Sequence, residues 1–590
     1  MLITRLKQRF FDLNIHAIVI PSADPHQSEY LADHWKLREW SSGFSGSAGT
    51  VVITRDQAGL WTDSRYYLQG EQELEGSGIT LYRDGQDGVP SITEFLSETL
   101  SEGQVVSLNP LMWSQAGVQN LTKKLSKSGI TVSTDHRVAE EIWDQLDRPQ
   151  LPNDEVFVHD LSFAEISVED KLRAVREDML DDEVVSQAVS QHLITTLDDI
   201  AWIFNLRGYD IAYNPVFLSY AVVRAEDAIL FIDPVKVTDE VKEHLAKAKV
   251  SILPYDEIGR FLKGNTSDIL VNPNDCNAHL YNLIDPKYIV EGPTITRLMK
   301  ACKTDLEMNH IDQVMIKDGV ALAQAFYEMY QRIGQITEGE FAALIANKRS
   351  QQDHYYGESF PAIVGYQANG AIVHYRPPTE GSAMIKAEGL LLCDSGGQYY
   401  NGTTDITRTI AVGPVTQAQK ESYTRVLKGH IAVDQAVFLD GTTGGEIDIL
   451  ARQYLWRNGQ NYGHGTGHGV GYFLNVHEPP QGISPGSGSR NKTVLEPGML
   501  TSNEPGFYED GAYGIRIENL IVCEESDHEG FLTHRHVTLF PLDTSIIVYD
   551  MLTKEEVNWI NTYHELVAEK LLPHLSGSVA EWMRMSCQPI

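Results

Sequence analysis

The stretch GHGTGHGVG, residues 463–471, has glycine at every second position and histidine at two of the positions between. A helix is costly here, because each glycine in a helix interior costs about 1 kcal/mol relative to alanine. The two histidines, four residues apart, are therefore not a helical zinc pair. Extended backbone is predicted instead, with His464, Thr466 and His468 on one face. The glycines leave the other face bare, so that another backbone or a substrate can approach it.

Two other segments place acidic side chains inside apolar strands. Each runs from an apolar strand through a Gly-rich turn to a second strand; they read GLLLCDSGGQYYNGTTDITRTIAVG and GMLTSNEPGFYEDGAYGIRIENLIVCEE. Opposed side chains of an antiparallel pair lie close together, so each segment is predicted to bring two carboxylates onto one face. These carboxylates are Asp394 and Asp405 in the first segment and Glu504 and Glu518 in the second.

Four buried carboxylates need a compensating charge, because like charges buried together are costly. A cation meets that need. Four carboxylates and one imidazole form an oxygen-rich set suited to Mn²⁺ or a similar divalent ion. Five ligands crowd a single ion, whereas two ions about 3.5–4 Å apart can share carboxylates. The residues alone therefore predict a hydrolase with two metal ions, and they leave open which histidine completes the set.

Length and charge exclude several classes of protein. The chain of 590 residues is too long for one hydrophobic core. Its 81 acidic residues outnumber 47 basic ones, which argues against a nucleic-acid partner. No apolar run approaches the roughly 18 residues of a membrane span, and the N-terminus lacks a signal-peptide pattern. Five scattered cysteines favour a reducing cytoplasm over a disulfide framework.

Two polar, proline-containing stretches, residues 146–155 and 285–297, divide the chain. The two parts before the second boundary look weakly alike, because both pair apolar strands across a charged turn, as VVITRDQAGLWTD and AVVRAEDAILFID. They are predicted to be two related α/β domains with helices between the strands, one of them over residues 168–194. The last part opens with an amphipathic helical pattern from Asp305, and a helical tail closes the chain.

At this point the sequence resembles a known family, the pita-bread metallopeptidases. The segments that carry the resemblance occur in the family's order and read NGAIVHYRP, CDSGGQYYNGTTDITRT, GHGTGHGVGYFLNVHE and SNEPGFYEDGAYGIRIEN. The N-terminal segments PSADPHQSEYLADHWKLREWSSGFSGSAGT and WTDSRYYLQG are similar to the first domain of the long, three-domain aminopeptidases P. The resemblance covers the whole chain and implies an α/β (α+β) architecture. The expected parts are two creatinase-N-terminal-like α/β domains at 1–150 and 151–297, a pita-bread catalytic domain at 298–540 and a short helical C-terminal extension at 541–590.

The resemblance also implies a role for each site residue. The five metal ligands are expected to be Asp394, Asp405, His468, Glu504 and Glu518, with Asp405 and Glu518 bridging two ions. Glu504 is also expected to move the proton of the attacking water. The residues expected to contact substrate or to stabilise the oxyanion are His374, His464 and His477. Arg516 is expected to hydrogen-bond to the ligands.

The implied activity is hydrolysis of the N-terminal X-Pro bond of peptides by a hydroxide that bridges two divalent ions. Mn²⁺ is the expected metal, and Co²⁺ and Zn²⁺ are the alternatives. The implied partners are peptides with proline at the second position and a second copy of the chain in a homodimer, with no nucleic acid and no membrane. Three alternatives share the fold. A prolidase acting on X-Pro dipeptides is disfavoured by the second domain before the catalytic one. A creatinase-like hydrolase and a non-catalytic peptide-binding module are disfavoured by the intact ligand set.

Overall fold

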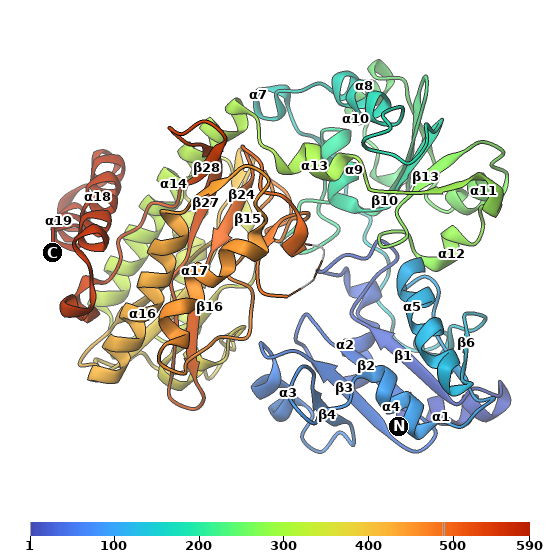
Figure 1. Ribbon diagram of the computed structural model, residues 1–590, viewed down its shortest axis with the longest axis horizontal. Coiled ribbons are helices and arrows are strands. Elements are labelled where there is room, and N and C mark those ends of the chain that lie inside the picture. The colour runs from blue at the N-terminus through green and yellow to red at the C-terminus, as the bar shows by residue number, and fades with distance from the viewer. Residues whose placement is uncertain (1, 487, 489) are drawn as a thin grey trace. The chain divides into compact units, whose positions relative to one another are not determined.

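Two sheets with the same strand order and directions lie in the first half of the chain. The computed structural model describes residues 2–486, 488 and 490–590, and its contacts divide the chain into two units, Met1–Thr296 and Arg297–Ile590 (Figure 1). The strands of the first sheet, in spatial order, are β4 (Thr80–Arg83), β3 (Ala58–Thr62), β2 (Thr50–Thr54), β1 (Ala17–Pro21), β5 (Val105–Ser107) and β6 (Thr131–Ser133). Those of the second are β12 (Val250–Leu253), β11 (Ala228–Ile232), β10 (Ser219–Arg224), β8 (Gln191–Ile194), β13 (Ile269–Val271) and β14 (Ile289–Glu291).

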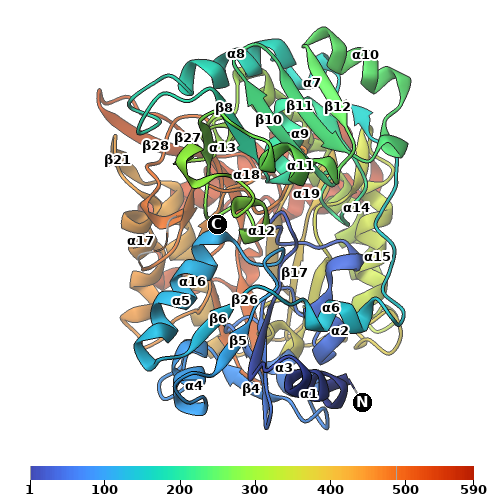
Figure 2. The ribbon, with the colours of Figure 1, turned by 90° about the vertical axis from the view of Figure 1, so that its right-hand side faces the viewer.

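Matching neighbours in the two sheets run in matching directions. β1 is antiparallel to β2 and parallel to β5, just as β8 is antiparallel to β10 and parallel to β13. Both predicted strand pairs are present, as β2–β3 and β10–β11, and Figure 2 shows β10, β11 and β12 side by side. This repeated topology confirms two related α/β domains.

Short helices accompany both sheets. Those of the first are α1 (Leu2–Asp12), α2 (Leu37–Ser42), α3 (Tyr67–Glu73), α4 (Ile92–Thr99), α5 (Gln115–Leu125) and α6 (Val138–Trp143). Those of the second are α7 (Leu161–Ala164), α8 (Val168–Asp178), α9 (Leu197–Ile203), α10 (Asp239–Lys247), α11 (Glu257–Lys263) and α12 (Ala278–Tyr281), with a ribbon of β7 (Phe157–Val158) and β9 (Leu206–Arg207). Helix α13 (Thr296–Ala301) begins at the last residue of the first unit and continues into the second. The predicted helix over residues 168–194 is wrong in its second half, because α8 ends at Asp178 and the last four residues form β8. These four residues are a strand because they pair with both β10 and β13 in the middle of the sheet.

The second unit surrounds its strands with long helices: α14 (Asp305–Gln331), α15 (Glu338–Arg349), α16 (Gln417–Asp434), α17 (Gly444–Trp456), α18 (Lys554–Leu571) and α19 (Gly577–Ser586). The predicted amphipathic helix is α14, whose first turn is closed by a capping box between Thr304 and Glu307. One large hydrophobic core joins α14, α16 and α18 to the central strands. Figure 1 shows α18 and α19 beside α14 at one edge of this unit. Among the described residues no helix is both long and apolar enough to cross a bilayer.

The two carboxylate-bearing segments share one design in which an inner hairpin interrupts an outer strand pair. In the first, β17 (Leu390–Ser395) pairs with β16 (Ile363–Tyr366) and β20 (Ile406–Ala411), and β18 (Gly397–Tyr399) and β19 (Gly402–Thr403) form the inner hairpin beside β15 (Tyr355–Glu358). In the second, β24 (Leu500–Asn503) pairs with β27 (Asn519–Glu525), and β25 (Gly506–Glu509) with β26 (Tyr513–Arg516). The remaining strands are β21 (Val437–Leu439), β28 (Phe531–His536), β22 (Gly467–His468) and β23 (Gly482–Ile483). Each acidic side chain therefore lies at or next to the junction of an outer and an inner pair.

Candidate metal centre

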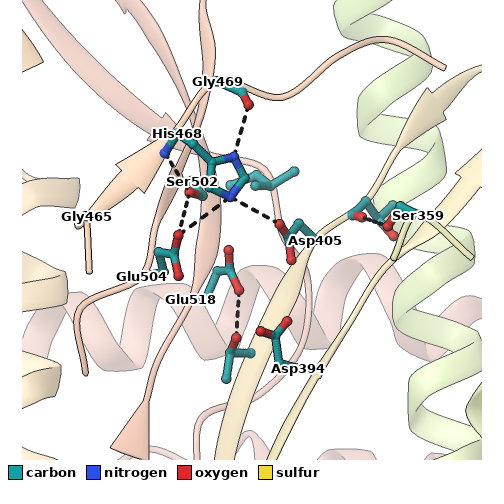
Figure 3. A network of polar contacts seen from close by, with 12 residues as sticks. Ser359, Asp394, Asp405, Gly465, His468, Gly469, Ser502, Glu504 and Glu518 are labelled. Atoms are coloured by element: carbon teal, nitrogen blue, oxygen red, sulfur yellow. Dashed lines mark hydrogen bonds and ion pairs between the residues drawn. The ribbon is translucent and has the colours of Figure 1, made fainter. Parts of the chain in front are cut away.

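The two segments meet along their outer strands, and this contact brings their carboxylates together. The backbone N–H of Glu518 donates to the carbonyl of Thr407 at 3.1 Å, and the Thr407 hydroxyl donates to Glu518 Oε2 at 2.7 Å. Asp405 comes two residues before Thr407, and Asp394 lies opposite Thr407 in the β17–β20 register. Acidic groups from both segments thus converge on one place (Figure 3).

Candidate ligand atoms lie close enough to share cations. One atom each from Asp405, His468 and Glu518 falls within 4.8 Å of the other two. His468 Nε2 is 3.5 Å from Asp405 Oδ2 and 3.5 Å from Glu504 Oε1. Figure 3 shows the carboxylate of Asp394 beside that of Glu518. Asp394 Oδ1 is buried and has no hydrogen-bond partner in the described part of the chain.

The hydrogen bonds of His468 fix which ring nitrogen faces the carboxylates. Nδ1 lies 3.0 Å from the carbonyl oxygen of Gly469, which can only accept, so in the neutral ring Nδ1 carries the proton. Nε2 then presents a lone pair toward Asp405 and Glu504. A lone pair and carboxylate oxygens facing one another 3.5 Å apart fit a shared cation between them.

The pKa shifts of the clustered carboxyl groups also indicate a cation site. Burial, reinforced by the neighbouring carboxylates, raises the pKa of Asp405 and of Glu518 well above their ordinary values. Burial also raises the pKa of Glu504, although the nearby His468 and Arg516 act against it. The cluster therefore resists carrying its full negative charge alone, and divalent cations would remove that repulsion. The residues present fit a pair of such ions.

Arg516 links the acidic cluster to the rest of the site. Its Nη2 donates to Asp394 Oδ2 at 2.6 Å and its Nη1 donates to the Tyr508 hydroxyl at 2.7 Å. Burial alone would lower the pKa of Arg516, but Tyr508, Asp394 and Glu504 raise it well above its ordinary value. Tyr508 Oη in turn lies 2.8 Å from His464 Nε2. Tyr508 was not among the predicted site residues, although it lies inside the motif SNEPGFYEDGAYGIRIEN that carries the resemblance.

The predicted histidines come from three places. The rings of His468 and His477 lie edge to face with their centroids 4.3 Å apart, which places His477 beside the cluster. His464 Nδ1 lies 2.7 Å from the Gly465 carbonyl, so that Nδ1 is the donor and Nε2 accepts from Tyr508. His374 is half-buried and lies on a separate loop, which follows a 3₁₀ turn at Gln367–Ala371.

The glycine-alternating stretch differs from the predicted strand, because in it only Gly467–His468 pair as a strand, with β23. Thr466 donates to Asp448 of α17 at 2.6 Å, whereas His468 Nε2 lies 3.5 Å from Asp405 and from Glu504. The glycines serve the chain's own backbone. A Cβ on Gly467 would lie 1.9 Å from the Ser502 carbonyl oxygen, and one on Gly469 would lie 2.2 Å from the Glu478 carbonyl oxygen. Close backbone packing, rather than room for substrate, explains these two glycines.

A buried ion pair anchors the loop that carries His477. The next residue, Glu478, is 1% exposed, and its Oε1 accepts from Lys303 Nζ at 2.6 Å. Lys300 Nζ lies 3.5 Å from Oε2 of the same carboxylate. Both lysines belong to the segment at the start of the second unit, so this segment and the histidine loop are tied together.

Models of four protein domains match the chain and together span most of it. Residues 3–141 and 147–307 each match a creatinase/prolidase N-terminal domain. Residues 310–525 match metallopeptidase family M24, and residues 530–590 match the C-terminal region of that peptidase family.

Proteins of similar length also match. The chain is 38% identical to aminopeptidase P2 of Arabidopsis thaliana over 98% of this chain and 86% of the relative. It is 40% identical to a probable Xaa-Pro aminopeptidase P of Fusarium vanettenii over 98% of this chain and 96% of the relative. Among solved structures, an X-prolyl aminopeptidase from Caenorhabditis elegans, described as a cytosolic enzyme with a di-nuclear active site, matches 100% of this chain and 99% of its own with 32% identity and a TM-score of 0.94. An Xaa-Pro dipeptidase from Bacillus anthracis covers only 64% of this chain.

Proposed function

Because the chain belongs to metallopeptidase family M24, we propose that it is an Xaa-Pro aminopeptidase that removes the first residue of peptides with proline second. The observation that carries this proposal is the convergence of four carboxylates and His468 in a chain that matches aminopeptidases of the same activity along its full length. A dipeptidase is disfavoured because the dipeptidase structure leaves more than a third of this chain unmatched.

We infer that Asp394, Asp405, His468, Glu504 and Glu518 hold two divalent cations. When bound, such ions lower the pKa of water and polarise a carbonyl group. The donor set of four carboxylates and one imidazole favours Mn²⁺ over softer metals. Arg516 keeps Asp394 oriented through the hydrogen bond at 2.6 Å, so one of its oxygens remains available for a cation.

The side chains around the cluster supply the proton transfers. Glu504 accepts the proton of the attacking water and passes it to the leaving proline nitrogen. His477 and His464 are the candidates to donate a hydrogen bond to the oxyanion. Of the two, His464 can donate from Nε2 only when both of its ring nitrogens carry protons, because Nδ1 already faces the Gly465 carbonyl. The free amino group of the substrate binds on the Asp394 side.

Proline selectivity follows from the chemistry of the bond. The X-Pro amide has no N–H, so proteases that recognise this donor handle the bond poorly. A site that needs no such donor, and whose wall accepts the pyrrolidine ring, avoids that difficulty. We assign His374 to the edge of this ring.

We also propose that the protein acts in the cytoplasm as a homodimer. Its five cysteines are all free in the structure, which suits a reducing compartment. The related nematode enzyme is described as cytosolic. Sedimentation of the purified protein at micromolar concentration tests the dimer.

One experiment tests the activity. Metal-stripped protein is incubated with X-Pro-Pro, X-Pro and X-Ala-Ala peptides, with and without added Mn²⁺, and release of the first residue is measured. We expect metal-dependent release from X-Pro-Pro. Preference for the X-Pro dipeptide would make the protein a prolidase. Metal binding without cleavage of any of the three would make it a peptide-binding module.

A further inference from the structure

The C-terminal helix α18 sends aromatic side chains into the core of the second unit. Trp559 and Tyr563 lie one turn apart and stack with ring centroids 5.3 Å apart. Tyr563 is fully buried and Trp559 is 6% exposed. A helix that served only to cover a hydrophobic surface would need no polar atoms at these positions. Both side chains nevertheless form hydrogen bonds, Trp559 through Nε1 and Tyr563 through its hydroxyl. Each is linked to one of the two strands, β24 and β27, that adjoin the glutamates of the metal centre.

Tyr563 reaches the strand of Glu518 through Arg408. The Tyr563 hydroxyl accepts from Arg408 Nη2 at 2.8 Å and contacts the Phe540 carbonyl at 2.9 Å. Arg408 is 1% exposed, and its Nη1 donates to the backbone carbonyl of Glu518 at 2.6 Å. Its Nη2 also donates to the side chain of Asn519 at 2.9 Å. The guanidinium thus holds the start of β27 by two bonds, and the Tyr563 hydroxyl, 3.3 Å from Asn519 Oδ1, accepts from the same Nη2.

Trp559 reaches the strand of Glu504 through α16. Its Nε1 donates to Asp434 Oδ2 at 2.6 Å. His430, one turn earlier on α16, packs its ring edge to face against Trp559 with centroids 5.9 Å apart. His430 Nδ1 lies 3.1 Å from the backbone carbonyl of Asn503, and the Asn503 side chain donates to the His430 carbonyl at 2.9 Å. These bonds hold the last residue of β24, immediately before Glu504.

The two strand ends are also neighbours of each other. Asn503 lies opposite Asn519 in the β24–β27 register, so the backbones that carry Glu504 and Glu518 are adjacent. A shift of either backbone would move a carboxylate out of the position that two shared cations require. Arg408 and His430 contact this pair of residues from the side of α18.

We propose that the C-terminal extension positions the metal ligands: Tyr563 and Trp559 of α18, acting through Arg408 and His430, hold the ends of β27 and β24, which adjoin Glu518 and Glu504. Both aromatic residues are positioning residues, because neither touches the metal centre. The proposal rests on the two-metal site proposed above and gives the extension a role beyond closing the core.

The first test removes a single hydroxyl. Tyr563→Phe keeps the ring and its stacking and deprives Arg408 of one acceptor. We expect its metal-stripped form to retain the wild-type circular dichroism and to bind Mn²⁺ about tenfold more weakly in calorimetry, since partners that orient ligands contribute ten- to 100-fold in affinity. The matched control is Tyr549→Phe, because Tyr549 lies in the same extension, is 51% exposed and donates only to the Thr544 carbonyl at 3.1 Å. A Tyr563→Phe dissociation constant equal to that of wild type and of Tyr549→Phe overturns the proposal.

The second test needs no substitution and decides the matter if Tyr563→Phe does not fold. Coupling is reciprocal, so if α18 supports the ligands, then metal binding must stabilise α18. Amide hydrogen exchange of the wild-type protein is compared with and without Mn²⁺. We expect slower exchange in residues 554–571 as well as in residues 500–525. Protection confined to residues 500–525 overturns the proposal while leaving the metal site intact. A wild-type protein that binds no Mn²⁺ overturns both this proposal and the proposed function.

Discussion

At the residue scale, the site depends on carboxyl groups that the fold buries close together, where their ionised form is unfavourable. Glu518 is 1% exposed, and its pKa is raised by burial first and by Asp405, Glu504 and Asp394 next. Among the described residues, its carboxylate accepts one hydrogen bond, from the Thr407 hydroxyl at 2.7 Å. Such a residue costs stability in the metal-free protein and repays it only when cations bind.

Glu518→Gln should therefore separate stability from function. We expect the variant to lose most of its bound Mn²⁺ and its peptidase activity. Its metal-free form should melt at least as high as metal-free wild type, because one unfavourable charge has gone. Metal analysis, kinetics and thermal melts with and without chelator measure the three quantities. Wild-type metal content in this variant would contradict the assignment of Glu518 as a ligand.

His464→Ala should lower the catalytic rate without loss of bound metal. Its ring bonds to Tyr508 and to the carbonyl of its own chain neighbour, Gly465. We expect kcat to fall by about 10²-fold, as for loss of one group that stabilises the oxyanion, with metal content unchanged. Metal loss in this variant would show instead that His464 supports the cation site.

At the element scale, buried polar contacts hold the segments around the site in place. The loop that carries His477 is tied to the start of the second unit by the fully buried pair of Lys303 and Glu478. Removing one partner of a buried pair leaves an uncompensated charge, which is costly in a medium that water does not reach.

Lys303→Met should consequently destabilise the protein strongly. We expect a loss of about 3 kcal/mol, at the lower end for a broken buried pair because Lys300 remains 3.5 Å from Glu478. Lys570→Met, which removes a lysine that is 45% exposed and pairs with Glu569, is the control and should change stability by less than about 1 kcal/mol. Urea unfolding measures both. Equal effects of the two substitutions would refute the role given to the Lys303 pair.

Strand β8 should make the stability of the first unit depend on pH. It contains His192, whose pKa is lowered from 6.5 to about 4, mainly by burial. The unfolded chain then binds the proton more tightly, so stability is present above pH 6.5 and is lost as the pH falls toward 4. Urea unfolding at pH 7.5 and 5 should show this loss, and His192→Gln should reduce it. An unchanged pH dependence in the variant would assign the loss to other groups.

At the scale of the whole molecule, the five candidate ligands and the supporting network all lie within residues 297–590. This unit has its own large core, built from α14, α16, α18 and the central strands. A unit with its own core can fold alone.

Residues 297–590 expressed alone should therefore fold and bind Mn²⁺. We expect cooperative thermal unfolding and an Mn²⁺ affinity within about tenfold of the full chain. Circular dichroism and calorimetry measure these properties. A fragment that stays unfolded at 25 °C in the presence of Mn²⁺ would show that the first unit is required for the fold of the second.

Sequence patterns predicted the elements whose signal is local. The strand pairs at residues 50–62 and 219–232 and the helix from Asp305 follow from alternation and helical periodicity, and the structure contains them. The predicted helix over residues 168–194 was wrong in its second half, because the short sequence QHLI of β8 is compatible with helix until its two strand partners are known. The division into parts at residues 150, 297 and 540 stays a prediction.

The sequence by itself determined the chemistry of the site: which acidic and imidazole groups exist, that two segments of one design carry them, and that hard cations suit them. Only the tertiary structure decided how they meet. Tyr508 contacts His464, which lies 44 residues away in the sequence, and Thr407 contacts Glu518, which lies 111 residues away. The periodicity of a sequence predicts only local structure, so it could not predict these contacts. The glycines of residues 463–471 show most clearly what the sequence could not predict. Their pattern predicted bare backbone, but which backbone would fill the space depended on the packing of β24 and the Glu478 loop against them.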